Sequence, residues 1–517
     1  MKNIKQLVSA IILFVFSMVA YGQDKINTPA AFETFKDRSQ WMYTNNAAGL
    51  LLDKPIDYAE VKFSYDSHSG GFHRPQTGEK INDLKFDVEG AVFVGNVYAW
   101  GKFNYTRSNI KDALFNASII DPYRDMPYMV ADTNMSKWNN QIYDLQFKVV
   151  TPKIWNKLSL GLEGSYNAAS GAKQRDIRTE NYFYILQVKP GIVYSINNNH
   201  HIGANFDFQT LKEESNMSNV NVYVDQNYYA LYGLGTATRG LGSGRTTNYE
   251  GNGVGGGFQY NYQGFFNLLF SSNYNYKVED VKISFTSPEE NATVKSKIWS
   301  GKLQLNKRLN KTTHYLTLNY ADKKIDGIEA ITQYDNTENQ SGYVTIYKDI
   351  RSKYKLQQAS LDYDFTIDRD LEYNWKFGIG VKYTNREDVY LTPRSEKNAE
   401  NLIAQFRIKK NFILSDDVLK RRVLLGADYS YNNNLSGGYS YNGSHPEYIV
   451  VTQFEQIDTD YLNSNFYSLG VNLTYSQKIK KDILANLFAK AEFRYTKATS
   501  YEFGNRNRLQ ISIGCNF

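Results

Sequence analysis

The sequence predicts an all-β fold, a transmembrane antiparallel β-barrel of about 18 strands preceded by a short helical segment. Three observations predict it: residues alternate between apolar and polar, the alternating segments are long, and aromatic residues are abundant. The 517 residues include 42 Tyr and 29 Phe, yet the mean hydropathy is only -0.53. This polar average excludes a helical membrane protein, because each helical span needs roughly 20 mostly apolar residues. The aromatic content argues against a disordered chain.

Two segments near the C-terminus show the alternation most clearly. From Tyr467 to Tyr475, apolar side chains occupy every second position, and small or polar residues lie between them. From Ile483 to Tyr495 the pattern is the same, but the second face carries charges. A period of two residues is that of a β-strand. Similar runs occur at residues 84–89, 158–163, 359–367 and 375–383.

The length of these segments favours a membrane barrel over a soluble β-protein. The two C-terminal runs have 9 and 13 residues, whereas strands of soluble sheets average about 5 to 6 and transmembrane strands need about 9 to 11. Aromatic residues flank several runs, as Trp375 and Tyr383 do, and this is typical of interfacial girdles. A β-sandwich or propeller is the alternative, but its strands are shorter and its turns more frequent.

The connections between the predicted strands alternate in length. Short connections are expected at residues 95–96, 197–199, 307–311, 368–370 and 480–482, and long polar ones at roughly 66–82, 108–137, 212–254, 324–352, 385–400 and 433–460. Outer-membrane barrels have short periplasmic turns and long outer loops. Counting from Tyr58 gives 18 strands. Sixteen is the alternative, because the split at Gln263-Gly264 is weak and Pro190, which lacks an N–H, predicts a bulge or a strand end.

The first 22 residues have the pattern of a signal peptide. Lys2 and Lys5 precede an apolar run from Leu7 to Ala20, and small residues occupy Ala20 and Gly22. Cleavage is expected before Gln23, so that the mature chain is exported. An uncleaved anchor helix is the alternative, but the apolar run is short for a bilayer.

Residues 23–57 differ from the barrel region, which is expected to span residues 58–517. Thr28 and Pro29 suit the N-cap and first position of a helix, and residues 30–43 predict a short amphipathic one. Residues 45–50 resemble the Asn-Pro-Ala element in the hatch of long-chain fatty-acid transporters, although Pro is absent here. This segment is expected to be a periplasmic extension or to fill the lumen.

The C-terminus carries a second resemblance. Apolar residues at every second position end on the last residue of the chain: Leu509, Ile511, Ile513, Cys515 and Phe517. This pattern resembles the terminal β-signal of Gram-negative outer-membrane proteins, which the barrel-assembly machinery recognises. With the signal peptide and the repeated strands, the resemblance implies an integral outer-membrane protein of an uncharacterised barrel family. Its expected partners are outer-membrane lipid and the barrel-assembly machinery.

Composition excludes several other classes of protein. Lys and Arg number 59 against 53 Asp and Glu, without a basic stripe, so nucleic-acid binding is not expected. The single Cys515 excludes an internal disulfide and a multi-cysteine zinc site. No cofactor, metal or catalytic residue is predicted. The glycines of residues 240–245 and 253–257 indicate a flexible outer loop, because the strand and helix of a phosphate-binding loop are missing.

Charged residues on the inner faces of the predicted strands are the candidate functional residues. Most are expected to meet where the barrel closes, and Asp362 and Asp364 are expected near Lys376 and Lys382 of the next strand. Such charges tune the selectivity of a water-filled lumen, or else they form a structural ion-pair lattice. The full set is Glu60, Lys62, Lys85, Asp87, Glu89, Asp362, Asp364, Lys376, Lys382, Lys490, Glu492, Arg494 and Arg508.

The function expected from these features is that of a channel or transporter for small polar or amphipathic solutes, and not that of an enzyme. The first alternative is a surface interaction or assembly protein that uses its long Tyr-, Asn- and Gly-rich loops. The second is a barrel enzyme acting on lipid or peptide, which would depend on His68, His73 and nearby Asp66.

Overall fold

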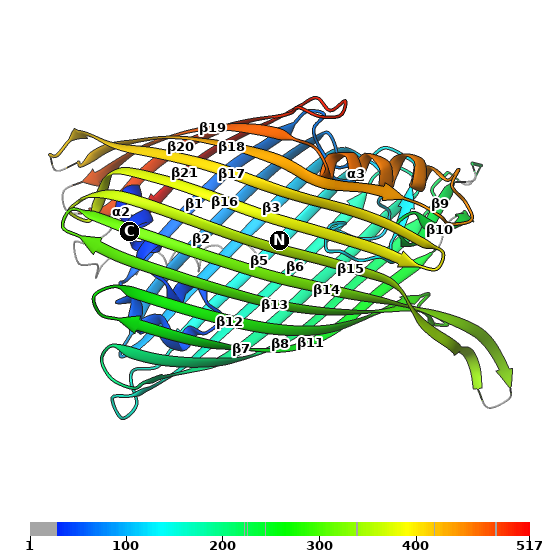
Figure 1. The fold of residues 1–517 in the computed structure, drawn as a ribbon, viewed down its shortest axis with the longest axis horizontal. Helices are drawn as coiled ribbons and strands as arrows, with labels where there is room; N and C mark the ends of the chain where they lie inside the picture. Colours follow the sequence, from blue (N-terminus) through cyan, green and yellow to red (C-terminus); the bar gives the residue numbers. More distant parts are fainter. Residues whose placement is uncertain are drawn as a thin grey trace, which may run out of the picture.

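The computed structural model describes residues 28–517 except 222, 225, 243, 244, 338, 339, 418, 481 and 482. Eighteen antiparallel strands form a closed barrel (Figure 1), which confirms the predicted fold class. The predicted signal peptide and its cleavage site before Gln23 lie outside the described residues. Among the described helices, none combines the length and the apolar character needed to cross a membrane.

The strands follow one another around the wall in chain order, and each pairs with its two neighbours. β21 pairs with β1 and closes the barrel, and Phe517 exchanges two backbone hydrogen bonds with Ala59 beside this seam. The strands are β1 (Tyr58–Ser69), β2 (Lys80–Val94), β3 (Val97–Ala113), β5 (Ser136–Val150), β6 (Leu158–Lys173), β7 (Arg178–Ser195), β8 (His200–Ser218), β11 (Thr246–Gln263), β12 (Asn267–Ile283), β13 (Glu289–Leu309), β14 (Thr312–Thr337), β15 (Gln340–Arg369), β16 (Glu372–Leu391), β17 (Arg394–Ser415), β18 (Arg421–Ser440), β19 (Phe466–Lys480), β20 (Ile483–Ala498) and β21 (Asn505–Asn516).

The apolar face of the strands points outward. Leu469, Val471 and Leu473 on β19 expose 48%, 52% and 48% of their surface, and Ile513 on β21 exposes 59%. A soluble protein rarely leaves so many large aliphatic side chains in water. On a membrane barrel the same face contacts lipid, and the polar residues between them face the lumen.

The predicted loop asymmetry holds, but several expected loops are strand. β14 and β15 extend as a paired hairpin through most of residues 324–352 and project beyond the rim (Figure 1). Residues 385–400 are also mostly strand, with a turn at Thr392 and Pro393. The hydrophobic alternation ends where the strands leave the bilayer, because both faces then meet water, whereas the backbone ladder continues.

Two local predictions were wrong. Pro190 causes neither a bulge nor a strand end: β7 pairs with β8 in the same register on both sides of it, because its missing N–H interrupts the ladder only locally. Residues 253–257 are not a flexible loop but part of β11. An added Cβ at Gly255 would lie 2.0 Å from Oδ1 of Asn275, so these glycines make room for amide side chains of the neighbouring strands.

Chain segments occupy both ends of the barrel interior. We call residues 28–57 the plug; they contain α2 (Pro29–Arg38) and the 3-10 helices η1 (Trp41–Tyr43) and η2 (Ala47–Asp53). The plug lies at the end with the short turns, which faces the periplasm in outer-membrane barrels (Figure 1). We call residues 72–77, 114–132, 227–241 and 448–463 the cap, at the opposite end. The cap contains η3 (Pro75–Thr77), β4 (Val130–Asp132), β9 (Asn227–Gly233), β10 (Thr236–Leu241), the π-helix η4 (Val450–Glu455) and α3 (Gln456–Leu462).

Candidate functional site

The plug begins with a helix that the local sequence specifies. Thr28 is the N-cap and its hydroxyl accepts a hydrogen bond from the N–H of Ala31, and Pro29 occupies the first turn. Phe32 and Phe35 pack edge-on against the ring of Tyr58, with centroid distances of 5.1 and 5.6 Å. One face of α2 is therefore buried against the start of β1.

The stretch after η1 rests on the backbone of the barrel wall. Asn46 donates from Nδ2 to the carbonyls of Ile192 and Ala204, at 3.0 and 3.1 Å. A Cβ added at Gly161 would lie 2.1 Å from the backbone N of Ala48, and one at Gly191 would lie 2.2 Å from Oδ1 of Asn46. The plug thus approaches β6 and β7 at a distance that only glycine permits.

Ion pairs join α2 to the opposite wall. Glu33 lies 3.0 Å from Nζ of Lys409, and Asp37 lies 2.6 Å from Nζ of Lys376. Burial raises the pKa of Glu33, but the charges of Lys409 and Lys376, with hydrogen bonds from Lys409 and Tyr373, outweigh burial and lower the pKa to about 2. The carboxylate of Glu33 is therefore ionised wherever the plug is docked near neutral pH.

A further lysine holds the middle of the plug. Lys148 on β5 donates from Nζ to the carbonyls of Met42 and Thr44, both at 2.8 Å. Asp53 at the end of η2 accepts from the N–H groups of Gln40, Trp41 and Met42. These bonds satisfy backbone groups that a short, irregular segment would otherwise leave unpaired.

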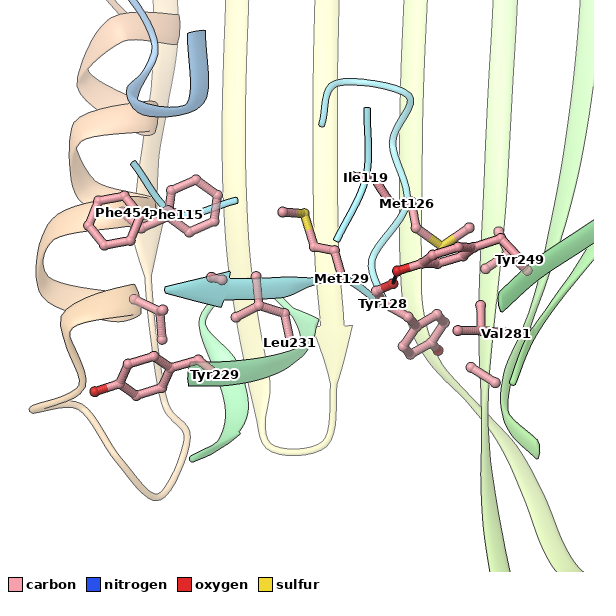
Figure 2. Packing of buried hydrophobic residues seen from close by; sticks show 14 of the residues in the cluster. Phe115, Ile119, Met126, Tyr128, Met129, Tyr229, Leu231, Tyr249, Val281 and Phe454 are labelled. Carbon is pink, nitrogen blue, oxygen red and sulfur yellow. Dashed lines mark hydrogen bonds between the residues drawn. The ribbon is translucent and has the colours of Figure 1, made fainter. Parts of the chain in front are cut away.

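The cap is held by a hydrophobic cluster inside the barrel (Figure 2). Phe115, Met126 and Tyr128 of the cap segment 114–132 pack with Leu231 of β9 and Phe454 of η4. The same cluster includes inward side chains of the wall: Tyr249, Val281, Ala292, Val294 and Ile325. The cap thus packs onto the inner face of β11 to β14 like a small domain core.

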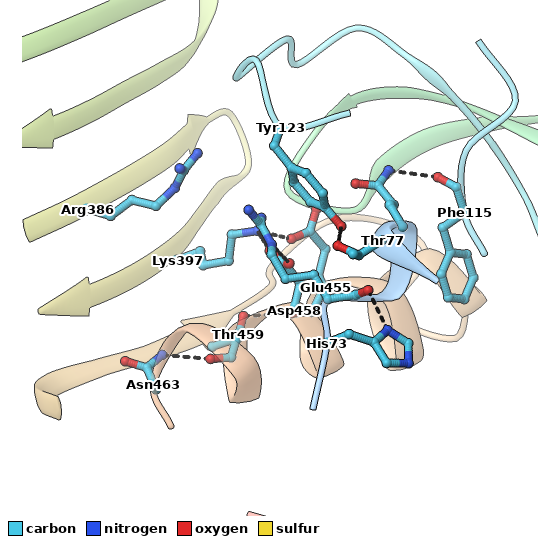
Figure 3. Close-up of polar contacts among 12 residues, drawn as sticks. His73, Thr77, Phe115, Tyr123, Arg386, Lys397, Glu455, Asp458, Thr459 and Asn463 are labelled. Carbon is cyan, nitrogen blue, oxygen red and sulfur yellow. Dashed lines mark hydrogen bonds and ion pairs between the residues drawn. The ribbon is translucent and has the colours of Figure 1, made fainter. Parts of the chain in front are cut away.

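A buried ion-pair network fixes the cap on its other side; we call it the latch. Asp458 of α3 accepts two hydrogen bonds from Arg74, from Nε at 2.6 Å and from Nη2 at 2.9 Å, and lies 3.1 Å from Nζ of Lys397. Glu455 lies 2.6 Å from the same Nζ (Figure 3). Burial opposes ionisation of Asp458, but Arg74 and Lys397 hold its pKa well below its usual range.

The latch continues across the lumen to the cap segment 114–132. Asp125 lies 2.7 Å from Nη2 of Arg386 and 2.6 Å from Nζ of Lys323. Arg124 is paired with Glu279 of β12 and lies 3.2 Å from Glu213 of β8. Both ends of the lumen are therefore occupied by segments that charge pairs attach to the wall.

The lumen contains cavities between the wall and the segments that occupy its two ends. One, of about 410 Å³, lies between the plug residues Tyr43, Thr44 and Asn45 and the strands β12 to β16. A second, of about 420 Å³, lies between plug residues that include the same three and the strands β1, β2, β3, β5 and β6. A third, of about 150 Å³, is lined by the latch residues Arg124, Asp125 and Lys323 and by wall residues of β7, β8 and β12 to β14.

The structure places the predicted lumen charges on the inner wall, mostly in ion pairs. Lys62 lies 3.5 Å from Asp87, and both Lys85 and Arg508 lie 2.8 Å from Asp66. The strands that carry the remaining charges meet where the barrel closes, as expected. Glu60 lies opposite Glu89 in the register, Glu89 binds Lys36 of the plug, Lys490 pairs with Glu492 on its own strand, and Arg494 pairs with Asp428.

Asp362 and Asp364 lie opposite Gly380 and Gly378 of β16, between Lys376 and Lys382 as expected, but their ion-pair partner is another residue. Both aspartates bind Nη2 of Arg407, at 3.1 and 3.4 Å, from two strands away. Gly378 and Gly380 lie opposite the two aspartates on the intervening strand β16, so the side chain of Arg407 can cross it. Lys376 forms an ion pair with Asp37 of the plug, and Lys382 lines the 410 Å³ cavity.

The histidines considered for catalysis are not brought into one site. His68 on β1 lies 3.2 Å from Asp66, but the carboxylate of Asp66 is shared with Lys85 and Arg508. His73 belongs to the cap, where its Nδ1 lies 2.9 Å from the carbonyl O of Arg74. Over the described part of the chain, no cluster of three or more His, Cys, Asp or Glu has the arrangement of a metal site.

Sequence reasoning missed several charged residues, both on the inner wall and on the segments that enter the barrel. Arg407 and Asp428 lie at inward positions of alternating segments, so the same period that found Asp362 identifies them. Glu33 and Asp37 lie on α2 and Asp458 on α3, where nothing in the sequence shows that the segment enters the barrel. Their partners are more than 50 residues away, and only the fold brings them together.

Comparison with known proteins assigns the family. No curated protein matches the chain. Similar solved structures include the ferric preacinetobactin receptor BauA from Acinetobacter baumannii (TM-score 0.42, 8% identity, covering 89% of this chain and 80% of that one). OpdK from Pseudomonas aeruginosa is another (TM-score 0.33, 9% identity, 89% and 99% covered). These likenesses are too distant to bear on activity. A family model described as "Family of unknown function (DUF6850)" matches residues 47–517, and the chain belongs to that family.

Proposed function

We propose that the protein moves small polar solutes across the outer membrane through its lumen, with the plug and the cap as gates. The observation that carries this proposal is the set of polar cavities between plug and wall. A barrel of 18 strands is wide enough for an aqueous lumen unless chain segments fill it. Here the segments fill its ends and leave polar space between the plug and the wall.

The attachment of the plug supports a gating role. Its contacts with β15 to β17 are mainly ion pairs and hydrogen bonds, such as Glu33 with Lys409 and Thr28 with Glu372. Water replaces such partners at lower cost than it replaces an apolar contact. Two hypotheses were open for the lumen charges: that they tune a solute path, and that they form a structural ion-pair lattice. Both are compatible with the proposal, because the charges form a lattice and this lattice holds the segments that would act as gates.

A liposome-swelling assay tests the proposal. Purified protein is reconstituted, and swelling is measured in neutral sugars and amino acids of increasing size. We expect slow swelling with the wild-type protein. The double variant Glu33→Ala with Asp37→Ala, in which the plug is loosened, should swell faster and only in solutes below a limiting size. Equal swelling of empty liposomes, wild type and the double variant would contradict passage through the lumen. Heat-modifiable migration on gels confirms that each variant is folded.

One observation favours surface interaction as a second candidate function. The β14–β15 hairpin projects past the rim (Figure 1) and exposes Ile331, Tyr334, Tyr343 and Ile346 to solvent. Exposed aromatic and aliphatic residues on a protruding element are typical of a contact surface. Deletion of residues 331–347 tests this function: we expect unchanged swelling and loss of a surface association, and an unchanged set of cross-linked neighbours would exclude it.

We also propose that residues 1–22 are removed on export and that the C-terminal pattern is read during barrel assembly. The support is the charged and apolar pattern before Gln23 and the alternating residues Leu509 to Phe517. N-terminal sequencing of the protein from outer membranes tests the first point, because a chain beginning at Met1 would exclude cleavage.

A further inference from the structure

Five polar side chains form one row across the inner wall beside the plug. In the strand register, Ser271 of β12 lies opposite Lys302 of β13, which lies opposite Asn319 of β14. Asn319 lies opposite Ser360 of β15, which lies opposite Lys382 of β16. All five line the 410 Å³ cavity, whose other side is Tyr43, Thr44 and Asn45 of the plug. We call these five residues the polar row.

The two lysines of the polar row have no acidic partner. Among the described residues, no carboxylate oxygen lies within 4.0 Å of the Nζ of Lys302 or Lys382. Lys302 is half-buried, with its Nζ 5.3 Å from the ring centroid of Tyr43, and Lys382 is exposed to the cavity. Five other lumen lysines contrast with them, because each of the five has a carboxylate within 3.0 Å: Lys85, Lys148, Lys323, Lys376 and Lys409.

The rest of the cavity wall is neutral and rich in hydrogen-bonding groups. Between the lysines, Nδ2 of Asn319 donates to Oγ of Ser360 at 3.1 Å. Asn273, Ser300 and Gln358 also line the cavity, whose described lining contains no Asp or Glu. Two uncompensated cations in a concave, partly dehydrated site attract anions, and the amides and hydroxyls match a ligand that carries hydroxyl groups.

The spacing of the lysines sets the shape of the ligand. Lys302 and Lys382 are separated by three strand-to-strand steps of about 4.8 Å each, or about 14 Å along the wall. A compact anion such as phosphate reaches one of them at a time. An extended ligand with negative charges at separate positions reaches both and lies along Asn319 and Ser360.

We propose that the polar row binds an extended, hydroxyl-rich anion of the acidic-oligosaccharide class inside the lumen. This inference rests on the proposed function, because the ligand would reach the polar row by passing through the lumen. The chemical class of the ligand is a separate claim. Each lysine contributes a charge-assisted contact. Removal of one such contact should lower the affinity for the ligand about tenfold or more.

Binding to the full-length protein in detergent micelles tests the proposal by isothermal titration calorimetry. The probes are tri-galacturonate, the neutral maltotriose and the small dianion succinate. We expect tri-galacturonate to bind best, with an affinity that falls as salt rises. Lys302→Gln with Lys382→Gln should reduce its affinity about a hundredfold. The control is Lys353→Gln with Lys355→Gln, which removes two charges from the outward face of β15 and should change nothing.

Each outcome decides the proposal. Equal binding of maltotriose and tri-galacturonate, or equal affinity in the row variant and the control, would overturn it. Succinate binding as tightly as tri-galacturonate would overturn the assignment of a hydroxyl-rich ligand. Every titration is repeated in the Asp458→Asn variant, which loosens the cap and gives the ligand access to the lumen. Absence of binding both with and without this substitution would also overturn the proposal. Binding without swelling would contradict only the transport function, and swelling without binding would contradict only this inference.

Discussion

At the scale of single residues, the plug depends on a few charges and on close approach to the wall. Glu33 is paired with Lys409, and Ala48 lies over Gly161 without space for a side chain. The first contact is electrostatic and depends on pH, whereas the second is steric and does not. Two substitutions separate them.

Replacing Glu33 by Gln should remove an acid-sensitive part of plug docking. Docking lowers the pKa of Glu33 from 4.5 to about 2. Its stabilisation is therefore fully present above pH 4.5 and is lost as the pH falls toward 2. As the pH falls between these values, the rate at which pepsin cleaves residues 28–53 of the wild type should increase. In Glu33→Gln this added pH dependence should be absent, and identical pH profiles of the two proteins would contradict the assigned role of Glu33.

Gly161→Ala should weaken docking at every pH. The new Cβ would lie 2.1 Å from the backbone N of Ala48, so the plug must shift, and such overpacking costs about 1–3 kcal/mol. We expect faster proteinase K cleavage of the plug at neutral pH. Gly101→Ala is the matched control, because the nearest atom to its Cβ lies 3.8 Å away. Equal cleavage rates in the two variants would rule out close contact at Gly161.

The residue scale also shows what the sequence can and cannot predict. Alternation places the side chains of Asp362 and Arg407 in the lumen, because a strand has only two faces. It does not pair them, because the pairing depends on the register of three strands and on the missing side chains at Gly378 and Gly380. That Lys302 and Lys382 have no acidic partner is visible only once the fold shows which carboxylates lie near each lumen charge.

At the scale of elements, α3 and η4 form a built-in part of the cap. The segment at residues 433–460 was expected to be a loop, yet its second half is helical and packs Val450 and Phe454 into the cap cluster. Periodicity does not find it, because the helices are short and their apolar partners, such as Phe115 for Phe454, come from cap segments distant in the sequence.

Asp458→Ala should release this element. The substitution leaves Arg74 without its bidentate partner and leaves Lys397 with Glu455 alone. Breaking a buried ion pair typically costs about 3–5 kcal/mol. We expect the amides of residues 450–463 to exchange with deuterium much faster. Asp460→Ala on the same helix removes only a hydrogen bond from Gln456 and is the control. Unchanged protection after Asp458→Ala would mean that the apolar cluster alone holds the cap.

At the scale of the whole molecule, closure depends on the last strand. Leu509, Ile511 and Ile513 lie outward on β21, and Phe517 bonds to Ala59 next to the seam with β1. The abundance of Tyr and Phe in a polar chain follows from this architecture, because every second strand residue faces lipid while the lumen and the loops face water. The sequence therefore predicts the barrel well, although its plug and cap have no signal of period two.

Deleting Phe517 should impair assembly. The deletion removes two backbone hydrogen bonds beside the closing seam and the terminal aromatic of the β-signal pattern. We expect a reduced amount of heat-modifiable protein in outer-membrane fractions, with Phe517→Tyr near wild type. A truncated chain that reaches wild-type levels would show that the terminal residue is not read.

We propose that the lumen is the solute path and that the plug closes it. Single-channel conductance in planar bilayers tests this most directly, with the wild type compared with a chain lacking residues 29–53. We expect low, intermittent conductance for the wild type and large, steady conductance for the deletion variant, which must still be heat-modifiable. Equal, negligible conductance of the two folded proteins would contradict it.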